Sequence, residues 1–241
     1  MKVFVVSATP EPQSFIAAMA RASVEVMRAQ GHEVVQSDLY AMNWNPVASP
    51  ADFGARANPD YLTYALEQRH NVTAGTIAPD IRAELDKLMA ADLLVLNFPV
   101  YWFSMPAILK GWIDRVLVSG LCYGGKRIYD KGNMTGKRAF VGATIGGREH
   151  MFGEGAVHGP IEHLLKPILQ GTLGYVGYDV LEPFIGWHVP YVTPEARGRI
   201  LADYRDALRN LDSRAALAMP SLDDFNPDMS RKSAEPERQA S

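Results

Sequence analysis

Cysteine, positive charge and long apolar runs are all scarce in this sequence. Cys122 is the single cysteine among 241 residues, so no disulfide can form within the chain. That usage fits a reducing compartment. The formal net charge is -3, and without a basic excess to meet phosphates we expect no nucleic-acid partner. No apolar run approaches the roughly 20 residues that a membrane-spanning helix needs, so we expect no membrane span.

Several sequence signals are also missing. No internal repeat is present, and neither a Walker loop nor a Gly-x-Gly-x-x-Gly pattern follows the first predicted strand, which disfavours a Rossmann dinucleotide fold. The histidines and acidic residues of 149–163 lack the His-x-x-x-His spacing of a helical metal site, so we expect no metal. The N-terminal apolar stretch 1–6 is too short for a secretory signal, so we expect a cytoplasmic protein.

What the chain does contain is an alternation of short apolar strands and amphipathic helices. Ser14 and Thr193 are good N-cap residues, and Pro106 and Pro194 suit the start or first turn of a helix. Buried parallel strands read as short apolar runs bounded by polar residues. The alternation predicts one α/β domain. The predicted strands are 2–7, 33–39, 92–96, 138–144 and 173–183.

The most informative stretch is 97–116, which follows the third predicted strand. Pro99 and Pro106 bracket an aromatic loop, 101–103, and an apolar helix follows. In open α/β sheets, ligands bind outside the carboxyl ends of the strands. The loop is therefore predicted to line a site for a flat ring with polar edges.

Two further turns fall at the ends of predicted strands. Gly146 and Gly147 end the strand 138–144, and a glycine pair by itself usually marks only a turn, but here it faces the aromatic loop. The turn after the first strand leads to Ser14 and a helix, whose free N–H groups favour an anion. An ordinary turn that binds nothing is the alternative for this second turn.

The stretch 98–112 closely resembles a family motif, Phe-Pro-x-x-Trp-Phe-x-x-Pro-Ala-Ile-Leu-Lys-Gly-Trp, and matches every fixed position of it. This is the motif of the NAD(P)H:quinone oxidoreductases. The resemblance implies a flavodoxin-like fold, a doubly wound five-stranded parallel sheet with helices on both faces. It implies a flavin-binding domain over residues 1–218, with 219–241 as a polar C-terminal tail that is partly mobile.

The resemblance also implies an activity and its partners. These flavoproteins use FAD, with NADH or NADPH as hydride donor, and FMN is the alternative cofactor for this chain. They transfer two electrons to quinones with ping-pong kinetics. The family is a homodimer with each site at the subunit interface. Trp112, Ile113 and Val116 are candidates for that interface, and a place in the core is equally compatible with the sequence.

Site residues follow from the resemblance, position by position. His158 aligns with the catalytic histidine, although a lone histidine is more often a surface or core residue. Tyr123 aligns with a tyrosine that reaches the neighbouring subunit's site, and Gly125 replaces a second one, which widens the substrate pocket. Phe152 replaces a tyrosine and Thr9 a histidine. The implied cofactor-binding residues are Thr9, Ser14, Phe15, Pro99, Val100, Tyr101, Trp102, Phe103, Thr144, Ile145, Gly146, Gly147, Phe152 and Arg197.

Other functions share this fold. An electron-carrier flavodoxin would have a Thr/Ser-rich phosphate loop and an acidic face, whereas this chain has a proline-rich loop at 8–13 and nearly balanced charge. An ancillary subunit of a bacterial potassium efflux system would also carry the aromatic loop. A nitro or azo reductase of the same fold is a further alternative.

Overall fold

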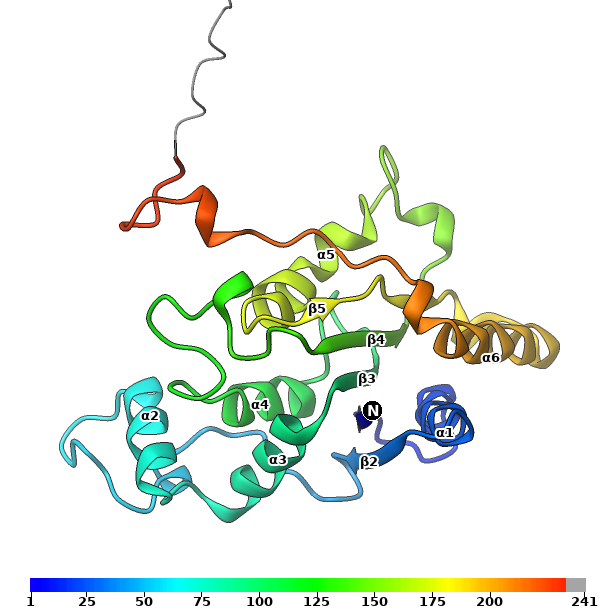
Figure 1. Cartoon of the computed structure of the whole chain (residues 1–241). Helices are drawn as coiled ribbons and strands as arrows, with labels where there is room; N and C mark the ends of the chain where they lie inside the picture. Colours follow the sequence, from blue (N-terminus) through cyan, green and yellow to red (C-terminus); the bar gives the residue numbers. More distant parts are fainter. Residues whose placement is uncertain (233–241) are drawn as a thin grey trace, which may run out of the picture.

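A computed structural model describes residues 1–232 and shows a parallel sheet between two layers of helices (Figure 1). The strand order is β2-β1-β3-β4-β5, with β6 also paired to β4, and every pair is parallel. This order confirms the predicted doubly wound, flavodoxin-like sheet. The strands are β1 Lys2–Ser7, β2 Glu33–Asp38, β3 Leu93–Pro99, β4 Arg138–Thr144, β5 Asp179–Val180 and β6 Phe184–Gly186.

The fifth position of the sheet is shared by two short strands. β5 pairs with the start of β4, and β6 pairs with its end, where Thr144 lies beside Gly186. Pro183 lies between them and has no N–H to donate to a ladder. The predicted strand 173–183 is wrong at its start, because Leu169–Gly174 forms a π-helical turn, η4. A short apolar run fits a buried helix as well as a strand.

Helices cover both faces of the sheet (Figure 1). The helices α1 Phe15–Ala29 and α6 Pro194–Arg209 pack together on one face. The helices α3 Pro79–Ala90, α4 Ala107–Val116 and α5 Ile161–Ile168 contribute to the core on the other face. The helix α2 Tyr64–Ala74 is tied to α4, because Gln68 Nε2 donates to the Asp114 carbonyl at 3.0 Å. The predicted caps are confirmed, since Ser14 and Thr193 accept from the first turns of α1 and α6.

Trp112 and Val116 lie in the core and are fully buried, and Ile113 is 6% exposed. Trp112 also donates its Nε1–H to the buried Glu84 carboxylate at 2.9 Å. The sequence left two locations open for these three residues, the subunit interface and the core, and the single chain places them in the core. Their burial fixes α4 against α3, and so fixes the position from which the aromatic loop starts.

The C-terminal segment 219–232 lies against the loop that precedes β4. Asp130 accepts hydrogen bonds from the Ser221 hydroxyl at 2.6 Å and from the Leu222 N–H at 3.0 Å. The expected mobile tail extends to residues 233–241, which lie outside the described residues. Within residues 1–232, none of the helices has the length and apolar character that a membrane crossing requires.

Candidate functional site

The aromatic loop is a tight two-residue turn. Tyr101 and Ser104 exchange N–H···O=C hydrogen bonds of 2.9 Å in both directions. Trp102 and Phe103 occupy the two central positions with φ values of 50° and 57°. Left-handed backbone is unfavourable for bulky residues, and such strain gathers at functional sites. The turn presents its rings outward, and Trp102 is 97% exposed.

The glycine loop after β4 lies beside this turn. Pro99 pairs with Thr144 at the ends of β3 and β4, and the Val100 N–H donates to the Thr144 carbonyl at 2.8 Å. The Ile145 N–H donates to the Gly186 carbonyl at 3.0 Å. Two adjacent strand ends and β6 thus meet at one edge of the sheet, as the sequence predicted for the aromatic and glycine loops.

His158 completes an aromatic cluster with Phe103, Phe152 and Trp187. Its imidazole lies 5.3 Å from the Phe103 ring and 5.0 Å from the Phe152 ring, measured between centroids. Phe152 in turn lies 5.1 Å from the ring of Trp187. Within residues 1–232, neither ring nitrogen of His158 has a hydrogen-bond partner. The imidazole is therefore held by ring packing.

Two residues of this site were missed from the sequence, Trp187 and His188. The His188 N–H donates to the Gly147 carbonyl at 2.9 Å, and its Nδ1 lies 2.7 Å from the Gly146 carbonyl oxygen. Both residues follow directly after β6 ends at Gly186. A correct prediction of where the last strand ends would have indicated both residues, because residues just beyond a strand's carboxyl end are candidates for a ligand site.

Unpaired backbone donors decide whether a flavin fits. Within residues 1–232, the N–H groups of Trp102, Phe103, Gly146 and Gly147 donate to no protein acceptor. Backbone N–H groups need a partner, either water or a ligand. Four such donors at two neighbouring strand ends suit a planar ring whose edge carries carbonyl and nitrogen acceptors. The isoalloxazine of a flavin has that edge, so the residues present fit the group.

The turn between β1 and α1 offers a second set of donors. The Thr9 and Ser14 hydroxyls bond each other at 2.8 Å, and Ser14 Oγ also accepts from the Ala17 N–H at 3.1 Å. In the part of the chain that the structure describes, the N–H groups of Phe15 and Ile16 have no acceptor. Free donors at the N-terminus of a helix favour a phosphate group. This turn fits a phosphate group.

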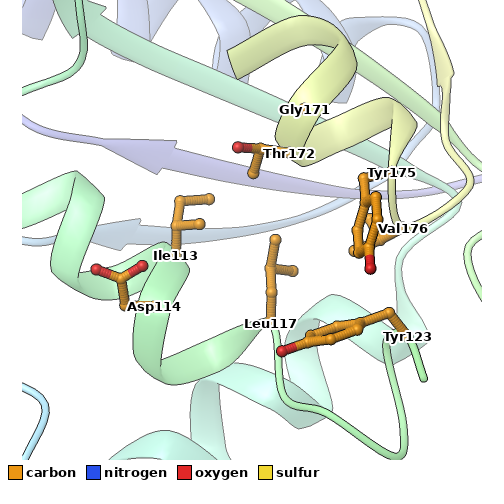
Figure 2. A pocket seen from close by; sticks show the side chains of 8 residues that line it. All are labelled: Ile113, Asp114, Leu117, Tyr123, Gly171, Thr172, Tyr175 and Val176. Atoms are coloured by element: carbon orange, nitrogen blue, oxygen red, sulfur yellow. The ribbon is translucent and has the colours of Figure 1, made fainter. Parts of the chain in front are cut away.

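Arg197 and Tyr123 contact other parts of the chain. Arg197 Nη1 donates to the Val192 carbonyl at 2.7 Å, so its guanidinium braces the segment after His188. Tyr123 packs against Tyr175 at 5.6 Å in a cavity of about 290 Å³ between α4 and η4 (Figure 2). Gly125 has a φ of +59°, and a Cβ added there would meet nothing within 4 Å. Assignment of these three residues to the cofactor or substrate stays a prediction.

The cysteine and the metal-ligating side chains of the described residues lie apart from any reactive arrangement of their own kind. Burial raises the pKa of Cys122 to about 12, so its thiol is not ionised near neutral pH. Across residues 1–232, no three His, Cys, Asp or Glu side chains are grouped closely enough to hold a metal ion.

Comparison with known proteins identifies relatives over most of the chain. Residues 1–211 match a family described by its flavodoxin-like fold. NAD(P)H dehydrogenase [quinone] 1 from Rattus norvegicus is 40% identical over 93% of this chain and 83% of that protein. Ribosyldihydronicotinamide dehydrogenase [quinone] from Mus musculus is 38% identical over 87% of this chain and 91% of that protein.

A solved structure agrees with these relatives. A putative quinone reductase from Klebsiella pneumoniae superposes with a TM-score of 0.92 at 33% identity, over 96% of this chain and 94% of that one. The overall fold is thus shared with a protein named as a putative quinone reductase. The chain belongs to the flavodoxin-like fold family, in the group that contains the NAD(P)H dehydrogenases (quinone).

Proposed function

We propose that this chain is a flavin-dependent NAD(P)H:quinone oxidoreductase. The observation that carries the proposal is the set of unpaired N–H groups at the ends of β3 and β4, with the imidazole of His158 beside them. The printed names of the relatives supply the reaction class, a quinone reduced at the expense of a nicotinamide.

A bound flavin would supply the two-electron redox chemistry, and the chain would supply position and charge. The N–H groups of Gly146 and Gly147 would bond the polar edge of the ring. The N–H groups of Phe15 and Ile16 would hold the pyrophosphate. Trp102 and Phe103 would present apolar rings next to the site, which keeps water from the reacting atoms.

His158 is the residue we propose as the catalytic acid and base. The other members of the aromatic cluster, Phe103, Phe152 and Trp187, carry no group that titrates near neutral pH. Phe152 keeps the ring contact at 5.0 Å but offers no hydroxyl. His158 would therefore hold or release the proton at its ring nitrogen without a second relay. One binding place for nicotinamide and quinone in turn predicts ping-pong kinetics.

The cofactor we propose is FAD, with NADH or NADPH as donor. FAD and FMN both have a ribityl chain between ring and phosphate, so the donors at 9–16 suit either cofactor, and the choice of FAD rests on the resemblance to the NAD(P)H:quinone oxidoreductases. Heat release followed by chromatography distinguishes FAD from FMN. Recovery of FMN alone would contradict this choice and leave the ring site intact.

We further propose that two copies associate. Trp102 is 97% exposed in the single chain, and Tyr101 and Phe103 beside it are 48% and 41% exposed. A continuous exposed aromatic surface of this kind marks a contact. The cavity around Tyr123 and Tyr175 (Figure 2) offers a second surface, lined by polar as well as apolar side chains. Sedimentation velocity would show a dimer, and a monomer at micromolar concentration would reject this proposal.

His158→Ala tests the proposed function. Loss of a positioned acid and base is expected to lower kcat for quinone reduction by about 100-fold, with flavin content unchanged. His163→Ala, on α5, is the matched control and should keep full activity. A protein that binds flavin but is never bleached by NADH or NADPH would reject the proposed activity.

A further inference from the structure

The end of β6 and the segment that follows it are hydrogen-bonded to the glycine loop. The Ile145 N–H reaches the Gly186 carbonyl at 3.0 Å, and the His188 N–H reaches the Gly147 carbonyl at 2.9 Å. These two bonds continue the β4–β6 ladder past the last paired residues, Thr144 and Gly186. The glycine loop is therefore an extension of the sheet on this side, whereas Gly146 and Gly147 keep their own N–H groups unpaired within residues 1–232.

The His188 side chain adds a third bond to the same loop. Its Nδ1 lies 2.7 Å from the Gly146 carbonyl oxygen. A carbonyl only accepts, so Nδ1 must carry the hydrogen and donate it. Because a peptide unit is planar, fixing the Gly146 carbonyl also fixes the direction of the Gly147 N–H.

The backbone at His188 is unusual for this residue type. Its φ and ψ are 56° and 22°, a left-handed conformation. Such a conformation costs free energy in any residue that has a Cβ, and glycine would adopt it without cost. The ring of Tyr191 lies 4.9 Å from the His188 imidazole and holds it in place. A histidine at a position that favours glycine suggests that the side chain contributes something glycine would lack.

We infer that His188 is a positioning residue that aims the N–H groups of the glycine loop at the polar edge of the bound flavin. The inference rests on the proposed flavin site. It concerns a residue that touches the loop and acts through it. Trp187, its neighbour, packs against Phe152 of the aromatic cluster at 5.1 Å. One short segment after β6 thus contacts both the glycine loop, whose N–H groups would bond the flavin, and the aromatic cluster that contains His158.

Two variants separate the side chain from the backbone. His188→Gly keeps the left-handed backbone and removes the donor. His188→Asn also tolerates that backbone and places an amide nitrogen at the same bond separation from the chain as Nδ1. Met229→Gly is the control, because Met229 also has a positive φ, 67°, but lies in the C-terminal segment 219–232.

The first readout is amide hydrogen exchange, in the flavin-free full-length chain, of the two backbone N–H groups that bond across this ladder, those of Ile145 and of residue 188. Loss of one hydrogen bond is expected to speed exchange there by about 3- to 10-fold in His188→Gly. His188→Asn should restore most of the protection, and Met229→Gly should leave it unchanged. Unchanged exchange in His188→Gly would overturn the inference.

The second readout is the dissociation constant for added FAD, measured by flavin fluorescence. His188→Gly should weaken binding by about 3- to 10-fold and shift the flavin absorption maxima, and His188→Asn should recover both. A wild-type chain that binds neither FAD nor FMN would reject the proposed function, while the exchange experiment would still test the hydrogen bond from His188 to Gly146. If His188→Gly fails to fold, equal behaviour of His188→Asn and His188→Leu would overturn the inference.

Discussion

Gly146 and Gly147 look equivalent in the sequence but differ in what surrounds them. A Cβ added at Gly147 would lie 2.7 Å from Phe152 Cε2, which is too close for any real contact. A Cβ added at Gly146 would meet only Tyr191 Cε2, at an ordinary 3.7 Å. The two positions therefore make a matched pair for the role of the glycine loop.

We expect Gly147→Ala to displace either the loop or the Phe152 ring, and Gly146→Ala to be tolerated. Overpacking of this kind costs about 1–3 kcal/mol, so flavin affinity should fall by roughly 10-fold in Gly147→Ala. Titration of both variants with FAD measures the difference. Equal affinities would show that the glycine loop adapts and does not hold a fixed ring edge.

Single residues also show how far sequence reasoning reaches. His158 was assigned through the family resemblance, because the family's catalytic histidine stands at the same spacing after the glycine pair, and its catalytic role stays a prediction. His188 could not be predicted, because its partner Gly146 lies 42 positions away and the pairing exists only through β4 and β6. A contact between distant segments needs the register of the sheet, which the sequence did not show for the last strand.

The aromatic turn, 101–104, belongs to the scale of elements. Its central residues have positive φ, which turns of this kind usually give to Asn or Gly. Trp102 is almost fully exposed, so its side chain recovers little of that cost by burial in the single chain. The turn therefore lowers the stability of the single chain, and it presents two aromatic rings at the site.

Trp102→Asn should stabilise the isolated chain while it impairs the site. Asn accepts the left-handed conformation more readily, and relief of about 1 kcal/mol corresponds to a rise in melting temperature of about 2–4 °C. Thermal unfolding of flavin-free protein measures this rise. A fall in melting temperature at protein concentrations too low for association would show that Trp102 packs within its own chain.

The buried ion pair of Arg115 and Asp52 connects elements across the face opposite α1. The Arg115 guanidinium contacts Asp52 at 2.8 Å and Asp80 at 2.8 Å. Tyr64 of α2 donates its hydroxyl to Asp52 as well. Burial alone raises the pKa of Asp52, but the hydrogen bonds from Arg115 and Tyr64 outweigh it and hold the pKa below its ordinary value of 3.8.

Asp52→Asn should destabilise the fold at neutral pH by about 3 kcal/mol. The buried Arg115 guanidinium would lose one of its two carboxylate partners. A carboxyl whose pKa is lowered on folding contributes stability above its unfolded value and loses it as the pH falls below about 3.8. The difference in the free energy of unfolding between wild type and Asp52→Asn should therefore become smaller at acid pH. Urea unfolding at pH 7 and pH 3.5 measures it, and a constant difference would contradict this account.

At the scale of the whole molecule, one polar ring joins α1, the central strand β3 and α6. Ser23 Oγ lies 2.8 Å from the Tyr204 hydroxyl and 3.1 Å from Asn97 Oδ1, and Asn97 Nδ2 donates to Tyr204 at 2.7 Å. All three side chains are fully buried. Buried polar groups that satisfy one another fix a unique arrangement of the elements that carry them.

Tyr204→Phe should therefore lower stability of the whole domain. Two buried groups would lose a partner at a cost of about 1–3 kcal/mol, or a melting temperature lower by roughly 2–10 °C. Tyr61→Phe is the control, because Tyr61 is 71% exposed. Equal melting temperatures would show that Ser23 and Asn97 find other partners in the core.

The sequence by itself determined the class of fold, the helix caps and the two loops that meet at the site. These features are local, since propensity, capping and motif spacing act within one stretch of chain. Only the tertiary structure decided that β6 delivers Trp187 and His188 to the glycine loop and that Trp112 is core. It also paired the hydroxyls of Thr9 and Ser14 with each other. Such contacts depend on which strands lie side by side and in what register, and packing of the whole chain sets both.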